Sequence, residues 1–313
     1  MTRKKSSKKW LAGALAISLA SLAGAPSASA NGHSIKSHEH EAERAGMKLA
    51  LFEKWAAGDE TRFKTNGKVI LLIHGATWSS HCTFDAVPSY SLMDTLADDG
   101  WDVFALDLHG YGQSGKTEKD WTESPSAAED IDAAIDYIRA YRWVEKVHVF
   151  GYQWGSQPAG IFAMKHPNKV GKLVLFGMRS TPEANLTEPT SQYRNNGASN
   201  AMLKPDDGDL DQEFVRRRSQ VCLAADPQSP NGAKRDMMRQ SFVDPLRIKS
   251  STMLIMGDRD ADAETVSDRL EFYKALATHS KWFVTVPGLG KFAPVERGRA
   301  RFEAALMSFL DLP

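Results

Sequence analysis

Short apolar runs recur along the chain and alternate with segments of helical spacing. The run at residues 68–73, Lys-Val-Ile-Leu-Leu-Ile, has one polar residue and five consecutive apolar ones. Unbroken apolar runs of this length are typical of strands buried on both faces of a sheet. The same pattern predicts strands at 102–106, 147–150, 172–176, 253–256 and 282–286.

Helical periodicity fills the intervals between these runs. Ala127, Ile131, Ala134, Ile138 and Tyr141 are spaced three to four residues apart, as on one face of a helix. Segments 156–166, 265–277 and 295–310 have a similar pattern. Strands that alternate with amphipathic helices predict an α/β fold, with a mostly parallel sheet and helices on both faces.

One region interrupts the alternation. Residues 178–246 are rich in Pro, Asn, Gly, Asp and Arg and contain no strand pattern. Since so long a segment is uncommon as a bare loop, we expect a cap or lid, with a helix at about 210–223. A cap there would cover the carboxyl ends of the strands, where open α/β sheets bind ligands.

The first thirty residues have the features of a secretory signal peptide. Five basic residues among the first nine precede a short apolar stretch at 11–22, and Ala28-Ser29-Ala30 offers a cleavage site. We therefore expect export to a periplasmic or extracellular location, without stable membrane insertion. Residues 31–45 are expected to be a flexible mature N-terminus, followed by one domain at 46–313.

Composition and charge reduce the range of possible functions and partners. Hydrophobic residues make up 42% of the chain and charged residues 25%, which suits a globular domain with a substantial core. Without residues 1–30 the net charge is about five units negative, which argues against a nucleic-acid partner. The triplet Arg216-Arg217-Arg218 is interpreted as a solvated helix face. Whether Cys82 and Cys222 form a disulfide is left open by the sequence.

Five short motifs follow the predicted strands. They are His74-Gly75-Ala76-Thr77-Trp78, the loop 107–114, the turn Gly151-Tyr152-Gln153-Trp154-Gly155, the loop 257–260 and the segment 287–294. The turn has the Gly-x-Nu-x-Gly pattern that places a nucleophile on a sharp bend between a strand and a helix. Its central residue is Gln153, whose carboxamide cannot act as a nucleophile.

In this order and spacing, the five motifs resemble those of the α/β-hydrolase family, from about residue 46 to the end of the chain. The resemblance implies hydrolysis of a small or medium apolar ester by a Ser-His-acid triad, without metal or cofactor. It assigns the acid position to Asp260, with Asp258 or Asp262 as substitutes, and the oxyanion-hole amides to Ala76 and Trp154. The nucleophile position falls on Gln153 and the histidine position on Lys291.

Both substitutions argue against triad chemistry. A lysine has an unperturbed pKa of about 10.4, so it is charged near neutral pH and cannot accept a proton. We expect an ion pair between Lys291 and Asp260, with Gln153 hydrogen-bonded beside it. The site is then expected at most to bind a small-molecule ligand, against the aromatic rings of Trp78 and Phe292.

Three interpretations remain open from the sequence. The chain is a non-catalytic relative that binds a ligand, or a serine hydrolase whose Ser and His were replaced by drift or deliberately. The third is an enzyme of different chemistry that uses Asp260 with His109 or Cys82.

Overall fold

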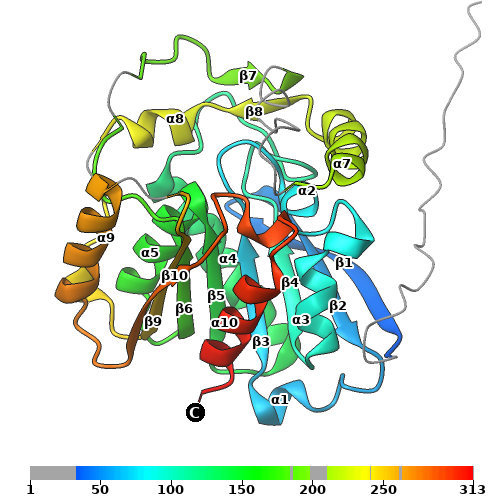
Figure 1. Ribbon diagram of the computed structural model, residues 1–313. Helices are drawn as coiled ribbons and strands as arrows, with labels where there is room; N and C mark the ends of the chain where they lie inside the picture. Colours follow the sequence, from blue (N-terminus) through cyan, green and yellow to red (C-terminus); the bar gives the residue numbers. More distant parts are fainter. Residues whose placement is uncertain (1–32, 184–185, 198–209, 240, 261–262, 313) are drawn as a thin grey trace, which may run out of the picture.

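A single mixed sheet organises the molecule. The computed structural model describes residues 33–183, 186–197, 210–239, 241–260 and 263–312. Eight strands follow the order β1-β2-β4-β3-β5-β6-β9-β10, with helices on both faces (Figure 1). Six of these strands, β4, β3, β5, β6, β9 and β10, are mutually parallel. Strand β2 is antiparallel to both of its neighbours, β1 and β4.

The six strands predicted from apolar runs are all present. They are β3 (Val69–Ile73), β4 (Asp102–Leu106), β5 (Val147–Tyr152), β6 (Val170–Phe176), β9 (Ser251–Gly257) and β10 (Lys281–Val286). Side chains of β3 alternate between two clusters: Leu71 lies in the core on one face and Leu72 in the core on the other. Both are 0% exposed, which explains why the run lacks polar residues.

Helices form a layer on each side of this sheet. One layer contains α3 (Leu92–Asp98) and α10 (Ala300–Leu310); the other contains α4 (Ser124–Arg142), α5 (Ser156–Lys165) and α9 (Ala263–Ala275). The last helix starts later than the expected residue 295, because a 3-10 turn, η4 (Ala293–Val295), precedes it. Short helices α1 (Phe63–Asn66) and α2 (Ser80–Phe84) and the 3-10 turns Pro88–Tyr90 and Pro245–Arg247 complete the domain. No helix in the described ranges is long and apolar enough to cross a membrane.

The N-terminal segment differs from expectation. Most of residues 31–45, expected to be flexible, belongs to strand β1 (Ile35–Arg44), which pairs along its length with β2 (Met47–Ala56). Ala45 and Gly46 both have positive φ, as in a two-residue hairpin turn that matches the twist of the strands. The segment is ordered because Ile35, His40 and Ala42 are buried, although most of its other side chains face solvent. The predicted signal peptide, residues 1–30, lies outside the described residues.

The segment between β6 and β9 forms a cap above the carboxyl ends of the parallel strands (Figure 1). It contains helices α7 (Gln212–Ala225) and α8 (Gly232–Met237). It also contains a ribbon that the sequence pattern did not reveal, in which β7 (Tyr193–Asn195) pairs with β8 (Gln228–Pro230). These strands are three residues each, too short to produce a periodic signal.

An arginine joins the hairpin to the rest of the sheet. Arg142, at the end of α4, forms ion pairs with Glu53 of β2 and with Asp102 of β4, where Nε lies 2.6 Å from Oδ2. Glu53 also accepts a hydrogen bond from His40 of β1, at 2.8 Å. The carboxylates are 1% and 0% exposed, and burial together with Glu53 raises the pKa of Asp102 to about 9. Two buried acids therefore depend on one cation.

Replacing Arg142 by Met should lower the free energy of unfolding by about 3–5 kcal/mol, because it leaves two buried acids without their cation. Urea denaturation followed by circular dichroism measures this change.

Arg139→Met is the matched control on the same helix. Arg139 pairs with Asp136, whose side chain is 53% exposed, so its loss should cost less than about 1 kcal/mol. Equal losses for the two variants would contradict the role assigned to Arg142.

Candidate functional site

The turn between β5 and α5 is the centre of the site, and we call residues 151–155 the elbow. Gln153 has a φ of +49°, a left-handed conformation that costs energy in a residue with a side chain. A Cβ at Gly151 would lie 2.6 Å from Cα of Ser156, and one at Gly155 would lie 2.7 Å from the carbonyl oxygen of Ile73. Glycine is therefore required at 155 for the turn to pack against the end of β3, and at 151 for the chain to pass close to Ser156.

The Gln153 side chain is tied to the segment that carries the histidine position. Its Nε2 donates a hydrogen bond to the carbonyl oxygen of Lys291, at 2.8 Å, and approaches the hydroxyl of Tyr152 at 3.2 Å. The Tyr152 hydroxyl donates to the same carbonyl, at 2.9 Å. The carboxamide of Gln153 therefore acts as a hydrogen-bond donor, and its acceptor is a main-chain carbonyl of the segment at 291.

Asp260 lies beside the elbow, but its cation differs from the one expected. A Cβ at Gly177 would lie 3.5 Å from Gln153 Cγ and 3.6 Å from Asp260 Oδ2, so both side chains lie beside this glycine. The expected ion pair between Lys291 and Asp260 is wrong: the paired cation is Arg269 of α9, whose Nη2 lies 3.6 Å from Oδ2. Burial raises the pKa of Asp260, and the charges of Arg269, Lys291 and Arg179 oppose that shift.

Of the two alternative acids, Asp258 has a role different from that of Asp260. Asp258 accepts a hydrogen bond from the amide of Gly288, at 2.8 Å, and so holds the turn after β10. Asp262 lies outside the described residues.

The Lys291 side chain is exposed and turns toward its neighbour. Its ammonium group lies 5.1 Å from the centre of the Phe292 ring, a cation–π contact. Glu296 stabilises this loop, because its carboxylate accepts hydrogen bonds from the amides of Gly290 and Phe292. The backbone at 290–292 is thereby fixed, whatever side chain position 291 carries.

Residues of the cap form hydrogen bonds with the predicted oxyanion loop. The Ala76 carbonyl accepts hydrogen bonds from Tyr111 and from Arg194 of β7, and the Thr77 carbonyl accepts from Ser229 of β8 and from Asn196. These bonds orient the two peptide units that follow the Ala76 amide. Three of the four donors that position the loop lie more than a hundred positions away along the chain.

The second predicted oxyanion residue is also held by the cap. Trp154 is 5% exposed, and its indole Nε1 donates to Asp236 of α8 at 2.9 Å. The same carboxylate oxygen accepts from the amide and hydroxyl of Ser124, both at 2.6 Å, at the start of α4. One buried carboxylate thus links the cap, the elbow and a core helix.

The two predicted pocket aromatics lie in different clusters. Trp78 packs with Cys82 and Cys222, whereas Phe292 packs against a cap cluster that includes Leu210 and Phe214. Both cysteines are buried free thiols. Ala86 packs against both clusters, so the two rings belong to neighbouring clusters.

The arginine triplet of α7 divides into two kinds of residue. Arg216 and Arg217 are exposed and pair with Glu213, as expected of a solvated helix face. Arg218 is 7% exposed, so the expectation is wrong for this residue. Its guanidinium lies 5.3 Å from the Trp78 ring centre, and its Nε donates to the carbonyl of Cys82 at 3.2 Å.

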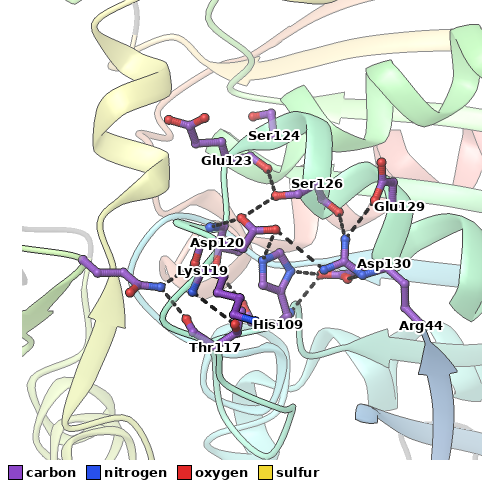
Figure 2. Close-up of polar contacts among 12 residues, drawn as sticks. Arg44, His109, Thr117, Lys119, Asp120, Glu123, Ser124, Ser126, Glu129 and Asp130 are labelled. Atoms are coloured by element: carbon purple, nitrogen blue, oxygen red, sulfur yellow. Dashed lines mark hydrogen bonds and ion pairs between the residues drawn. The ribbon is translucent and has the colours of Figure 1, made fainter. Parts of the chain in front are cut away.

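His109 is enclosed rather than placed at the edge of the site. It is 0% exposed and lies between Asp130, 2.5 Å from Nδ1, and Asp120, 3.3 Å from Nε2. Arg44 forms ion pairs with both carboxylates (Figure 2). Burial lowers the pKa of its imidazole, but hydrogen bonds to both carboxylates outweigh that effect and raise the pKa to about 9. A buried, protonated imidazole is not available as a general base.

The thiol of Cys82 is equally unsuited to attack. Its hydrogen bond with Cys222 and its burial raise its pKa, so it is protonated at neutral pH. The interpretation that combines Asp260 with His109 or Cys82 has no support in this geometry.

Several site residues had no signal in the sequence. Arg269, Arg194, Asp236 and Glu296 contact the site from four separate segments. Only Glu296 could have been suspected, since it follows the last motif by two residues.

Comparison with known proteins agrees with this architecture. A family model described as "alpha/beta hydrolase fold" matches residues 68–216. A 2-hydroxy-6-oxononadienedioate/2-hydroxy-6-oxononatrienedioate hydrolase of Escherichia coli (strain K12) is 30% identical over 136 residues. That match covers 43% of this chain and 42% of the relative, less than half of either.

Solved structures resemble the chain over most of its length. A probable hydrolytic enzyme from Pseudomonas aeruginosa is 21% identical with a TM-score of 0.64, over 88% of this chain and 95% of the other. A 2-hydroxy-6-oxo-6-phenylhexa-2,4-dienoate hydrolase from Rhodococcus is 17% identical with a TM-score of 0.60, over 89% and 100%. At these identities the likeness concerns the fold.

The His109 ion-pair cluster should make stability depend on pH. A histidine whose folded pKa is raised from about 6.5 stabilises the protein fully below that pH, and this contribution disappears as pH rises through the folded value. With a folded pKa of about 9, the loss is on the order of 3 kcal/mol between about pH 6.5 and 9.

His109→Gln removes this titration. The difference in unfolding free energy between the wild type and the variant, measured by urea denaturation, should shrink across that pH interval. A difference that stays constant from about pH 6 to about pH 10 would show that His109 is not charged in the folded protein.

Proposed function

Because the chain belongs to the α/β-hydrolase fold family, we propose that it binds a small organic ligand at the elbow without triad hydrolysis. The observation that carries the proposal is the Gln153 carboxamide, which occupies the nucleophile position and donates its hydrogen bond to the carbonyl of Lys291. An amide nitrogen used as a donor offers no lone pair to a carbonyl carbon.

The groups that would assist a nucleophile are also replaced or occupied. The lysine at the histidine position presents an ammonium group, which can only donate. Asp260, which would orient a histidine, is in contact with Arg269. His109 and Cys82 are both buried, and each is protonated, so neither replaces the missing pair.

Other parts of the site favour retained ligand binding. Gln153 and Lys291 remain accessible, and the cap holds both the oxyanion loop and Trp154 in place. The E. coli relative acts, by its name, on a dienedioate, which is a carbonyl compound with two carboxylates. A related small acid is a reasonable ligand class for this chain.

A second candidate is a serine hydrolase whose Ser and His were replaced by drift or deliberately. The intact packing of Gly151 and Gly155 favours it, since the turn would accept a serine at position 153 without rearrangement. The two candidates differ in what restoring the triad would produce.

The wild type should show no saturable hydrolysis of p-nitrophenyl butanoate above that of Gln153→Ala. Saturable activity lost in Gln153→Ala would contradict the proposal.

The double variant Gln153→Ser with Lys291→His tests the second candidate. If the site is otherwise intact, the double variant should hydrolyse the ester about 10²–10⁴-fold faster than Gln153→Ser alone, because a general base contributes that range. Measuring kcat and KM of both variants gives the ratio. No gain would mean that the site has been rebuilt around its new residues, which favours the binding protein.

A further inference from the structure

Three cations near the elbow have no carboxylate partner among the residues that the structure describes. Arg179, Arg218 and Lys291 form no ion pair with any residue in the described ranges. The chain as a whole has a formal net charge of zero, and most of its other buried or half-buried cations are paired, as Arg142 is with Asp102. Among the described residues, these three cations are therefore left without an acid of their own.

Each cation reaches the elbow from a different element. Lys291 precedes η4, and its carbonyl is bonded to Gln153. Arg179 follows β6 by three residues, and its charge, like that of Lys291, acts on Asp260. Arg218 comes from cap helix α7 and acts on the Tyr152 phenol, whose pKa burial raises and the Arg218 charge lowers.

Two of these side chains carry unsatisfied donors. Arg218 is 7% exposed, and its Nη1 has no hydrogen-bond partner within the described part of the chain. The same holds for Nε of Arg179. Unpaired buried charge is costly, so a native structure that keeps it usually has a partner that binds there.

We propose that the ligand carries a carboxylate, which Arg218 and Lys291 bind at the elbow while Arg179 contributes positive charge from the side of Asp260. The inference rests on the proposed ligand-binding function and narrows its ligand class. Asp260 forms its ion pair with Arg269 and with none of these three cations.

The surroundings favour an aromatic acid over an inorganic anion. The Arg218 guanidinium lies over Trp78, and Lys291 lies over Phe292, so each cation is placed beside a ring. A guanidinium offers paired donors that match the two oxygens of a carboxylate. An aryl group attached to that carboxylate would contact the rings.

The test compares 4-phenylbutanoate with its neutral analogue 4-phenylbutanamide by isothermal titration calorimetry of the full-length protein. We expect the acid to bind at least tenfold more tightly than the amide. Arg218→Gln and Lys291→Gln should each weaken binding of the acid about tenfold and leave the amide unchanged, as a lost charged contact would.

Arg216→Gln is the matched control, since Arg216 is exposed on the same helix and pairs with Glu213. It should leave both affinities unchanged, and circular dichroism checks that each variant is folded.

The outcomes separate the two proposals. Equal affinity for acid and amide, or an Arg218→Gln variant with unchanged affinity for the acid, would overturn the carboxylate assignment and leave ligand binding standing. Displacement of the acid by inorganic phosphate at equal concentration would overturn it in favour of a general anion site. Binding of neither probe would overturn both proposals.

Discussion

The close packing of the elbow against the end of β3 is the constraint on which the site depends. Gly155 lies so near the carbonyls of Ile73 and His74 that no side chain fits, and Gly151 is equally enclosed by Gly155 and Ser156. This contact forces position 153 into a left-handed conformation and presents its side chain at the edge of the sheet. The geometry holds whichever side chain is there, so it persists with a glutamine and serves a contact with the Lys291 carbonyl.

The cap completes the site through a few buried polar groups. Arg194 and Ser229 bind carbonyls of the oxyanion loop, and Asp236 binds Trp154. Each bond satisfies a group that would otherwise be buried without a partner, so the cap and the sheet edge stabilise one another. The cations at the elbow are different, since Arg179, Arg218 and Lys291 form no ion pair with the described residues.

The fold was largely predictable, and the failures have physical causes. The central strands are buried on both faces, so their sequences contain the unbroken apolar runs that reveal them. Strand β1 was not predicted because it lies at the edge of the sheet, with most of its side chains in solvent, and so contains few apolar residues. Its conformation is fixed by pairing with β2. The predicted ion pair between Lys291 and Asp260 was wrong because α9 brings Arg269 to the acid. The order of the motifs along the chain does not reveal that another cation competes for Asp260.

The sequence by itself determined the sheet, the turn at 151–155 and the two replaced positions, because these depend on local periodicity, glycine and the chemistry of single side chains. Only the tertiary structure decided which charges meet. It buried Arg218 beside Trp78 while its neighbours Arg216 and Arg217 stayed in solvent, and it enclosed His109 between two carboxylates. The energy of a charge depends on its burial and on partners that lie far along the chain, and neither is written in the local sequence.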